Sequence, residues 1–184
     1  MRSETPSFMS GNTRAKLGAM ATRDLTSLSE RRADLRARYL KSAGERPPSV
    51  GGGVHHLALI CDDPERTIRF YQDFLGFPLV ELFENRDYRG STHLFFDVGH
   101  DNYLAYFDFP GLDLGDYAEV LGGLHHIAIS VAPERWTRLV GKLEAAGVET
   151  HVVGGTSVYF AGPDGERIEL LSYKLNDMYG TVVS

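Results

Sequence analysis

Cysteine is almost absent from this chain, because Cys61 is the only one among 184 residues. A single cysteine cannot form an intrachain disulfide, so we expect a protein of the reducing, cytoplasmic compartment. No apolar run is long enough to span a membrane, and the first twenty residues lack the apolar core of a secretory signal. These absences argue against a disulfide-stapled secreted domain and against a membrane partner.

Positive charge is scarce outside the first fifty residues. Residues 1–50 carry ten Lys or Arg against five Asp or Glu, a net charge of +5. Residues 51–184 carry nine against twenty, a net charge of −11. An acidic body of this kind argues against nucleic acid as a partner.

Residues 1–50 predict an extension and not a domain of their own. Residues 1–22 have the composition of a flexible tail, and an organelle transit peptide is the alternative interpretation. Apolar residues then recur at helical spacing, and Ser27 with Glu30 fits a capping box at the start of a helix. The sequence thus predicts an amphipathic helix over about 25–42 that packs on its own domain or on a second subunit.

Two stretches of the remaining chain are nearly the same: "GGVHHLALICDDPER" from Gly52 and "GGLHHIAISVAPER" from Gly122. In each copy an aliphatic strand is followed by a proline at the first position of a helix. Further on, "HLFFDVGHDNYLAYF" aligns with "SVYFAGPDGERIELL" at an offset of 64 residues. Each copy therefore predicts a β-α-β-β-β module.

The repeat predicts an α+β fold in which two tandem modules form one continuous curved mixed sheet around a cleft. The expected parts are a first module over 54–110, a second module over 122–175, together a domain over 54–175, and a tail over 176–184.

Alternation of side chains along the strands predicts which histidines point into the cleft. The bulkier aliphatic residues should lie under the helices, which turns His56 and His126 to the opposite, concave face. By the same rule Ile168 and Leu170 face the helix, and Glu169 points into the cleft. Two imidazoles and one carboxylate are typical of mononuclear Fe(II) sites, although Mn, Zn, Co or Ni use the same set.

The alternative for these residues is structural. A strand histidine is often a hydrogen-bonded core residue, and a glutamate near a turn is often solvated. Ala105 occupies the position equivalent to Glu169 in the first module and has no donor atom, so a metal held by the other three would keep open positions.

The chain from about Val54 to Tyr173 resembles the vicinal oxygen chelate superfamily of glyoxalases, fosfomycin- and bleomycin-resistance proteins, epimerases and extradiol dioxygenases. The resemblance is carried by "HLALICDDPERTIRFYQDFLGF" and "FAGPDGERIELLSY". It implies a metalloenzyme in which His56, His126 and Glu169 are the metal ligands.

Within this superfamily the chain is most similar to the extradiol ring-cleaving dioxygenases, which use three ligands and a characteristic run of residues before the last. That run corresponds here to His151, Val158-Tyr159, Pro163-Asp164-Gly165 and Glu169. Glu149 and Gly162 depart from the pattern. The resemblance implies Fe(II), dioxygen and a catechol-like substrate with two adjacent oxygens, oriented by hydrogen bonds from His151 and Tyr159.

Such a dioxygenase also needs an acid–base group near the oxygen site, and its position falls on "GHDNY". His100 and Asn102 are the candidates, although an asparagine cannot transfer a proton as an imidazole can. His93, Phe95 and Tyr103 are candidates for lining the substrate pocket, and ordinary core packing is their alternative role.

Two other functions stay open at this point. One is a lyase, isomerase or thiol transferase that uses Mn, Ni or Zn without oxygen. The other is a metal-free protein that sequesters a drug. In all three cases the resemblance implies a small-molecule partner and a homodimer.

Overall fold

The computed structural model of the chain describes residues 25–178 and 181–182, so the tail predicted over 1–22 lies outside the described range. Val50–Leu175 form one compact unit, and the described residues on either side of it belong to a second unit. Both predicted modules lie within the first unit. Among the described helices, none is both long enough and apolar enough to cross a membrane.

The second unit contains the predicted N-terminal helix, α2 (Leu25–Tyr39), and a short 3-10 turn, η1 (Ala43–Glu45). The helix is confirmed, but it ends before residue 42, and none of its side chains is buried. The amphipathic face and the capping box are therefore corrected. The apolar residues are too sparse among the arginines to form a covered stripe, and Ser27 lies inside the helix. The same unit holds a two-stranded antiparallel ladder, β9 (Asp177–Met178) and β10 (Thr181–Val182).

The first module follows the predicted β-α-β-β-β order. Its helical part begins at Pro64, where the side chain of Asp63 caps the helix by accepting from the amide of Arg66. It ends at Gly76, which takes the left-handed conformation (φ 81°) of a helix C-cap. The elements are β1 (His56–Ile60), α3 (Pro64–Ile68) continued by the π-helix η2 (Arg69–Leu75), β2 (Leu79–Glu84), β3 (Thr92–Gly99) and β4 (Asn102–Phe107).

The second module repeats the same order. Its helix again begins at a proline, Pro133, and buries Leu139 and Leu143 on its inner face. The Pro163-Asp164-Gly165 segment makes the predicted turn between the last two strands. The elements are β5 (Ile127–Ser130), α4 (Pro133–Ala145), β6 (His151–Val153), β7 (Ser157–Ala161) and β8 (Arg167–Leu171).

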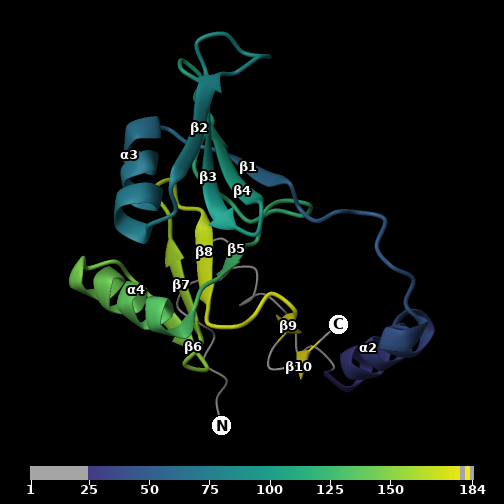
Figure 1. Cartoon of the computed structure of the whole chain (residues 1–184). Coiled ribbons are helices and arrows are strands. Elements are labelled where there is room, and N and C mark those ends of the chain that lie inside the picture. Colours follow the sequence, from purple (N-terminus) through teal and green to yellow (C-terminus); the bar gives the residue numbers. More distant parts are fainter. Residues whose placement is uncertain (1–24, 179–180, 183–184) are drawn as a thin grey trace. The chain divides into compact units, whose positions relative to one another are not determined.

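The two modules form two four-stranded mixed sheets with the same strand order, β1-β4-β3-β2 and β5-β8-β7-β6 (Figure 1). In each sheet the first strand pairs in parallel with the last, and the other pairs are antiparallel. The α+β fold of tandem modules is confirmed, but the single continuous sheet is not. β1 and β5 are both edge strands, and no ladder joins them within the part of the chain that the structure describes.

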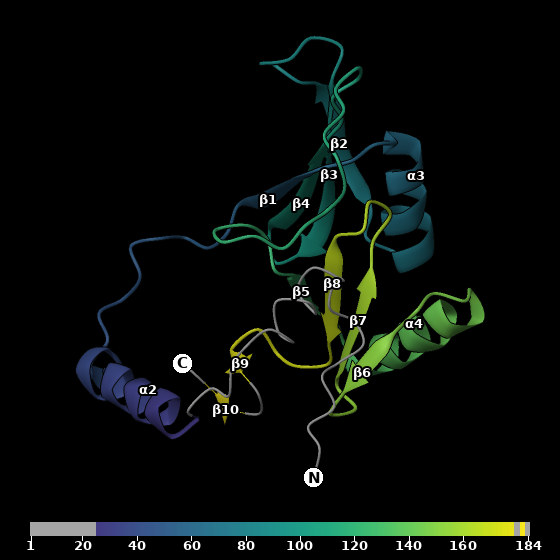
Figure 2. The same cartoon turned by 180° about the vertical axis from the view of Figure 1, so that it is seen from behind.

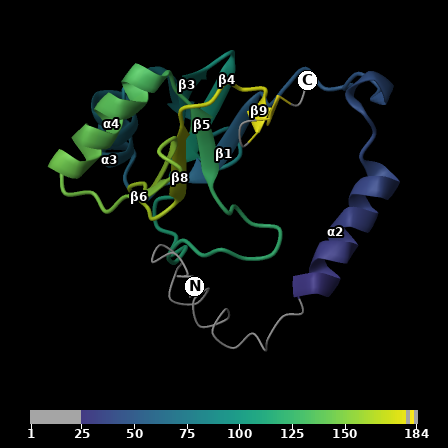
Figure 3. The same cartoon turned by 90° about the horizontal axis from the view of Figure 1, so that it is seen from below.

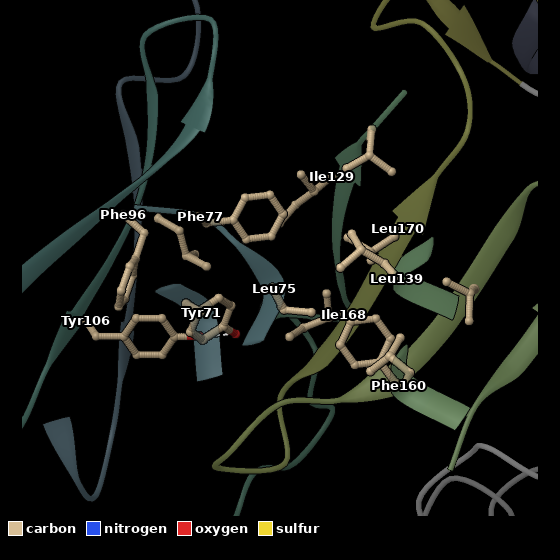
Figure 4. Close-up of a cluster of buried hydrophobic side chains, with 14 of the residues drawn as sticks. Tyr71, Leu75, Phe77, Phe96, Tyr106, Ile129, Leu139, Phe160, Ile168 and Leu170 are labelled. Atoms are coloured by element: carbon tan, nitrogen blue, oxygen red, sulfur yellow. Dashed lines mark hydrogen bonds between the residues drawn. The ribbon is translucent and has the colours of Figure 1, made fainter. Parts of the chain in front are cut away.

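One hydrophobic core joins the two modules. The helices α3 and α4 lie on the same side of the two sheets (Figures 1 and 3). Beneath them, Phe77 and Phe96 of the first module face Ile129, Ile168 and Leu170 of the second (Figure 4). Figure 2 shows the same arrangement from behind, again with both helices on one side of the sheets.

A buried polar cluster fastens the modules to each other within this core. The hydroxyl of Tyr71 donates to Oε1 of Glu166 at 2.7 Å, and the hydroxyl of Tyr106 lies 2.8 Å from the same oxygen. The amide of Asp164 donates to Oε2 of Glu166 at 3.0 Å. Burial raises the pKa of Glu166 above its ordinary value, and these donors oppose that rise. A Cβ on Gly162 would lie 2.1 Å from Oε1, so the glycine that departs from the dioxygenase pattern makes room for this carboxylate.

Candidate metal centre

Four predicted or neighbouring site residues form one row across the second sheet. Ala128 on β5 pairs with Glu169 on β8, Glu169 pairs with Tyr159 on β7, and Tyr159 pairs with His151 on β6. Directly paired residues share a face of a sheet. Ile168 and Leu170 point the other way and are fully buried in the core. Glu169 therefore lies on the face away from the core, as the alternation predicts, and Tyr159 and His151 share that face with it.

His126 stands beside this row and contacts Glu169. The two side chains meet at 3.1 Å between His126 Nε2 and Glu169 Oε2, and they are 29% and 6% exposed. The other carboxylate oxygen of Glu169 accepts a short hydrogen bond from the hydroxyl of Ser157. The ring of Tyr159 lies edge-on to the ring of His126, with centroids 5.7 Å apart. Both oxygens of the buried carboxylate are thus held, and one of them lies against an imidazole nitrogen.

Burial decides the charge of His126. Removal of the ring from water lowers the pKa of His126 below its ordinary value, and the attraction of Glu169 only partly opposes this. The contact between them is therefore a hydrogen bond of a neutral imidazole at pH 7. A neutral imidazole beside an oriented carboxylate is the form in which these two groups ligate a metal.

His56 lies on the first sheet, on the face opposite the helices. It pairs with Tyr103, and the next row on that face contains Ala58, Ala105 and Phe95. The ring of Phe95 lies 5.6 Å from that of His56. His56 is exposed, its neighbours in the next row include the two alanines, and its role as an inward ligand stays a prediction.

His93 and Phe95 form an aromatic wall on the same face of the first sheet. The His93 ring stacks on Phe107 at 3.7 Å and lies 4.2 Å from Phe95. Burial and the nearby His56 lower the pKa of His93, and its buried Nε2 has no hydrogen-bond partner. Phe83 closes the far side, 5.2 Å from His93. The side chains expected to line a pocket therefore gather on one surface.

The chain does not bring all three predicted ligands into one group. Among the described residues, no three His, Cys, Asp or Glu side chains are clustered so that they could hold a metal ion. His126 and Glu169 meet on the second sheet, whereas His56 belongs to the first. The predicted cleft is therefore present as two half-sites, and the three-ligand set stays a prediction.

The acid–base candidates lie at the tight turn between β3 and β4. His100 and the following Asp101 are the only described residues other than glycine with a positive φ, 54° and 57°. His100, Asn102 and Tyr103 border a cavity of about 310 Å³ whose apolar lining includes Leu57. Neither His126 nor Glu169 lines that cavity, so the structure does not unite His100 or Asn102 with the ligand pair.

Sequence reasoning missed four residues around the ligand pair. Ser157, which binds Glu169, aligns with His93 at the repeat offset of 64 and gave no signal of its own. Arg167 forms an ion pair with Glu119, and its guanidinium also lies 3.2 Å from His125 Nε2. The second histidine of the "HH" pair was the available signal for His125. Glu119 lies in the connection between the modules, where no periodicity points to it.

The half-site on the second sheet fits a divalent metal by the chemistry of its donors. It offers a neutral imidazole nitrogen and a carboxylate oxygen, and the second carboxylate oxygen is already fixed by a hydroxyl. Hydrogen bonds of this kind to ligating groups orient them for the ion.

Two proteins that are named for an enzymatic activity are similar to this chain in sequence. A glutathione transferase, FosA, from Serratia marcescens is 29% identical over 120 residues, which cover 64% of this chain and 78% of that protein. A putative ring-cleaving dioxygenase, MhqE, from Bacillus subtilis is 29% identical over 82 residues, which cover 42% of this chain but only 26% of that protein.

Solved structures agree with the fold. The fosfomycin resistance protein FosX from Listeria monocytogenes superposes with a TM-score of 0.52 at 22% identity, covering 69% of this chain and 95% of that one. A mutant of that protein was crystallised with Mn(II) and 1S,2S-dihydroxypropylphosphonic acid. The model of the Glyoxalase/Bleomycin resistance protein/Dioxygenase superfamily matches residues 53–170, which is well over half of the chain. With its two βαβββ modules and this match, the chain belongs to that superfamily.

Proposed function

We propose that this protein is a divalent-metal enzyme, and that its reaction is the extradiol-type cleavage of a catechol-like substrate with Fe(II) and dioxygen. The observation that carries the proposal is the row across the second sheet. Glu169, which contacts His126, stands in register with Tyr159 and His151, the two residues that the dioxygenase pattern assigns to the substrate.

When bound, the ion would supply the Lewis-acid and redox chemistry that ring cleavage with dioxygen requires. The chain would supply position and hydrogen bonds. Ser157 and His126 fix the two oxygens of Glu169, so this carboxylate does not need to be ordered by the substrate. Tyr159 and His151 would orient an oxygen of the substrate from the adjoining positions of the same row.

The third ligand, His56, would come from a second copy of the chain. Its strand β1 is an edge strand on which Leu57 and Ile60 are 37% and 49% exposed. An exposed apolar edge favours pairing with another chain. A homodimer of this kind would set the aromatic wall around His93 and Phe95 opposite the ligand pair, and so enclose a planar substrate.

A complementation experiment tests the shared site. His56→Ala and Glu169→Ala should each abolish metal binding, but refolding the two variants together should restore one intact site in each mixed dimer. Elemental analysis and Co(II) titration would measure about half a metal per chain in a purified mixed dimer. If each chain instead built its own site, the mixture would stay without metal.

Oxygen consumption tests the proposed reaction. Protein reconstituted anaerobically with Fe(II) should consume oxygen when given a panel of catechols and should form yellow ring-cleavage products. An absence of both in metal-loaded protein would falsify the dioxygenase assignment.

A metal-dependent transferase, lyase or isomerase is the second candidate. It is favoured by one observation: the similarity spans 78% of the curated glutathione transferase but only 26% of the curated dioxygenase. Turnover with Mn, Ni or Zn under argon would establish this function in place of the first. Protein that contains and rebinds less than about a tenth of a metal per chain would instead point to metal-free drug sequestration.

A further inference from the structure

Each module carries a second histidine directly before the one assigned to the metal. In the first module Nδ1 of His55 lies 2.9 Å from Nδ1 of His56, and in the second Nδ1 of His125 lies 2.7 Å from Nδ1 of His126. Both pairs place one ring edge-on to the other, with centroids 5.1 and 4.9 Å apart. The leading histidine of each pair therefore touches the ligand ring on the side away from Nε2.

Only the second module adds a cation to this pair. Arg167 lies next to His125, with 3.2 Å between its NH1 nitrogen and His125 Nε2, while its NH2 nitrogen forms a close ion pair with Glu119. The side chains of Arg167 and Glu119 are only 9% and 11% exposed. Separating the two side chains would leave an uncompensated charge in a buried place. The ion pair therefore holds the guanidinium in one position.

The direction of every hydrogen bond in this chain of groups follows from Arg167. A guanidinium can only donate, so Nε2 of His125 accepts and the ring proton of His125 lies on Nδ1. That proton is donated to Nδ1 of His126. The ring proton of His126 is then on Nε2, the nitrogen that lies 3.1 Å from Glu169 Oε2.

The connection between the modules holds this arrangement from outside. Glu119 lies in that connection, and so does Tyr117, whose hydroxyl lies 3.0 and 3.1 Å from the carbonyl oxygens of Leu124 and His125. The backbone that leads into β5 is thus held at Leu124 and His125.

In the described part of the first module, no arginine stands beside His55 in the way that Arg167 stands beside His125. Tyr103 occupies the position equivalent to Arg167, and its ring lies 6.0 Å from His55. A phenol ring at that distance does not decide which nitrogen of His55 carries the proton. The difference between the modules is therefore a natural internal control.

We infer that Arg167, held by Glu119, is a positioning residue that acts through His125 to present Nε2 of His126 beside Glu169. The inference rests on the proposed metal site only in its last step, because the orientation of His126 exists without any ion. A cation bound at Nε2 would displace that proton, and the neutral ring would then have to carry its proton on Nδ1 and donate to His125. The hydrogen bond between the two histidines would have to reverse, so the arrangement fixes the metal-free tautomer and opposes metal binding.

The first test reads the tautomer of His126 in metal-free protein. Long-range ¹H–¹⁵N spectra should show one form, protonated on Nε2, in the wild type. His125→Phe keeps the size of an exposed ring and removes both hydrogen bonds, so it should give a mixture of the two forms. The double variant Glu119→Gln/Arg167→Met removes the buried pair together and should give the same mixture. His55→Phe, the matched change in the first module, should leave His126 as it is.

The second test measures Co(II) affinity in the same variants, with melting temperatures as the check on folding. We expect His125→Phe to strengthen binding by about tenfold, because Nδ1 of His126 can then carry the proton while Nε2 binds the ion. An unchanged tautomer in His125→Phe overturns the inference, and so does an affinity within twofold of the wild type. If the wild type binds no metal, the proposed function fails, but the tautomer spectra still decide the positioning role.

Discussion

The two modules share one backbone plan and divide the chemistry between them. At the repeat offset of 64, Glu169 of the second module corresponds to Ala105 of the first, and Tyr159 corresponds to Phe95. This face of the second sheet is thus polar and holds a carboxylate with its hydrogen-bond partners. The face of the first sheet is an aromatic wall that includes two histidines, His56 and His93. The core positions of the two modules remain alike, and the positions on the opposite face differ, polar in the second module and mainly aromatic in the first.

The core positions show how strict that preservation is. Val158 and Phe160 correspond to Leu94 and Phe96, and all four are fully buried. Large-to-small changes at such positions cost several kcal/mol, whereas changes on the open face cost little stability. The two halves of the protein could therefore specialise on one face without losing the fold.

The largest expected effect is the loss of metal affinity when a proposed ligand of the second module is substituted. Glu169→Gln and His126→Ala should each weaken divalent-metal binding by at least about a thousandfold, or about 4 kcal/mol, because the first removes the charge and the second the nitrogen of a proposed ligand. Isothermal titration with Co(II) or Mn(II) measures this. His151→Ala, from the same row of the sheet, should keep metal affinity within a few-fold and serves as the control. Equal loss in all three variants would contradict the division between ligands and neighbouring residues.

The next effect concerns the contact between the modules. Gly162→Ala should lower the free energy of unfolding by about 3 kcal/mol, because the new Cβ would lie 2.1 Å from the buried carboxylate of Glu166. Urea unfolding measures the loss. Gly141→Ala in α4 is the matched control, because nothing lies within 4 Å of its added Cβ. That helix substitution should stabilise by up to about 1 kcal/mol.

The repeat made most of the fold predictable, and the strand alternation made part of the site predictable. The direction of Glu169 followed from side-chain period alone, since its neighbours Ile168 and Leu170 are buried on the other face. The separation into two sheets did not follow, because backbone pairing between edge strands leaves no mark in side-chain pattern. For the same reason the sequence placed His56 in one cleft with His126, and the structure places it on the other sheet.

The partners of the site were the least predictable part. Ser157 and Glu119 are common polar residues whose roles come from tertiary contact and not from spacing. The N-terminal helix was found, but its partner was not, because sparse leucines between arginines do not specify a covered face.

The first module has no carboxylate at the position equivalent to Glu169, and adding one tests whether that difference decides metal affinity. Ala105→Glu places a carboxylate at the position equivalent to Glu169, in the row next to His56. We expect metal affinity to rise by about tenfold and oxygen-dependent turnover to fall, because a fourth protein ligand occupies a position that substrate or oxygen needs. Co(II) titration and oxygen uptake measure the two effects. Ala105→Gln has a similar volume without the charge, and an equal gain in that variant would mean that charge is not the cause.

The smallest expected effect is the pH dependence of stability, to which each module contributes one half-buried histidine. The pKa values of His93 and His126 are both lowered by burial, so the unfolded chain takes up protons at a higher pH than the folded chain does. Stability should therefore be complete above about pH 6.5 and fall as the pH is lowered through the folded pKa values. We expect each histidine to account for less than about 1 kcal/mol, since both rings are only partly shielded from water.

Urea unfolding of metal-free protein at pH 7.5 and pH 5 measures the slope. His93→Phe should flatten it, because the phenylalanine keeps the stacked ring on Phe107 and removes the proton-binding nitrogen. His126→Phe should flatten it by a similar amount, and a slope that responds to only one of the two variants would show that the modules differ in this property as well.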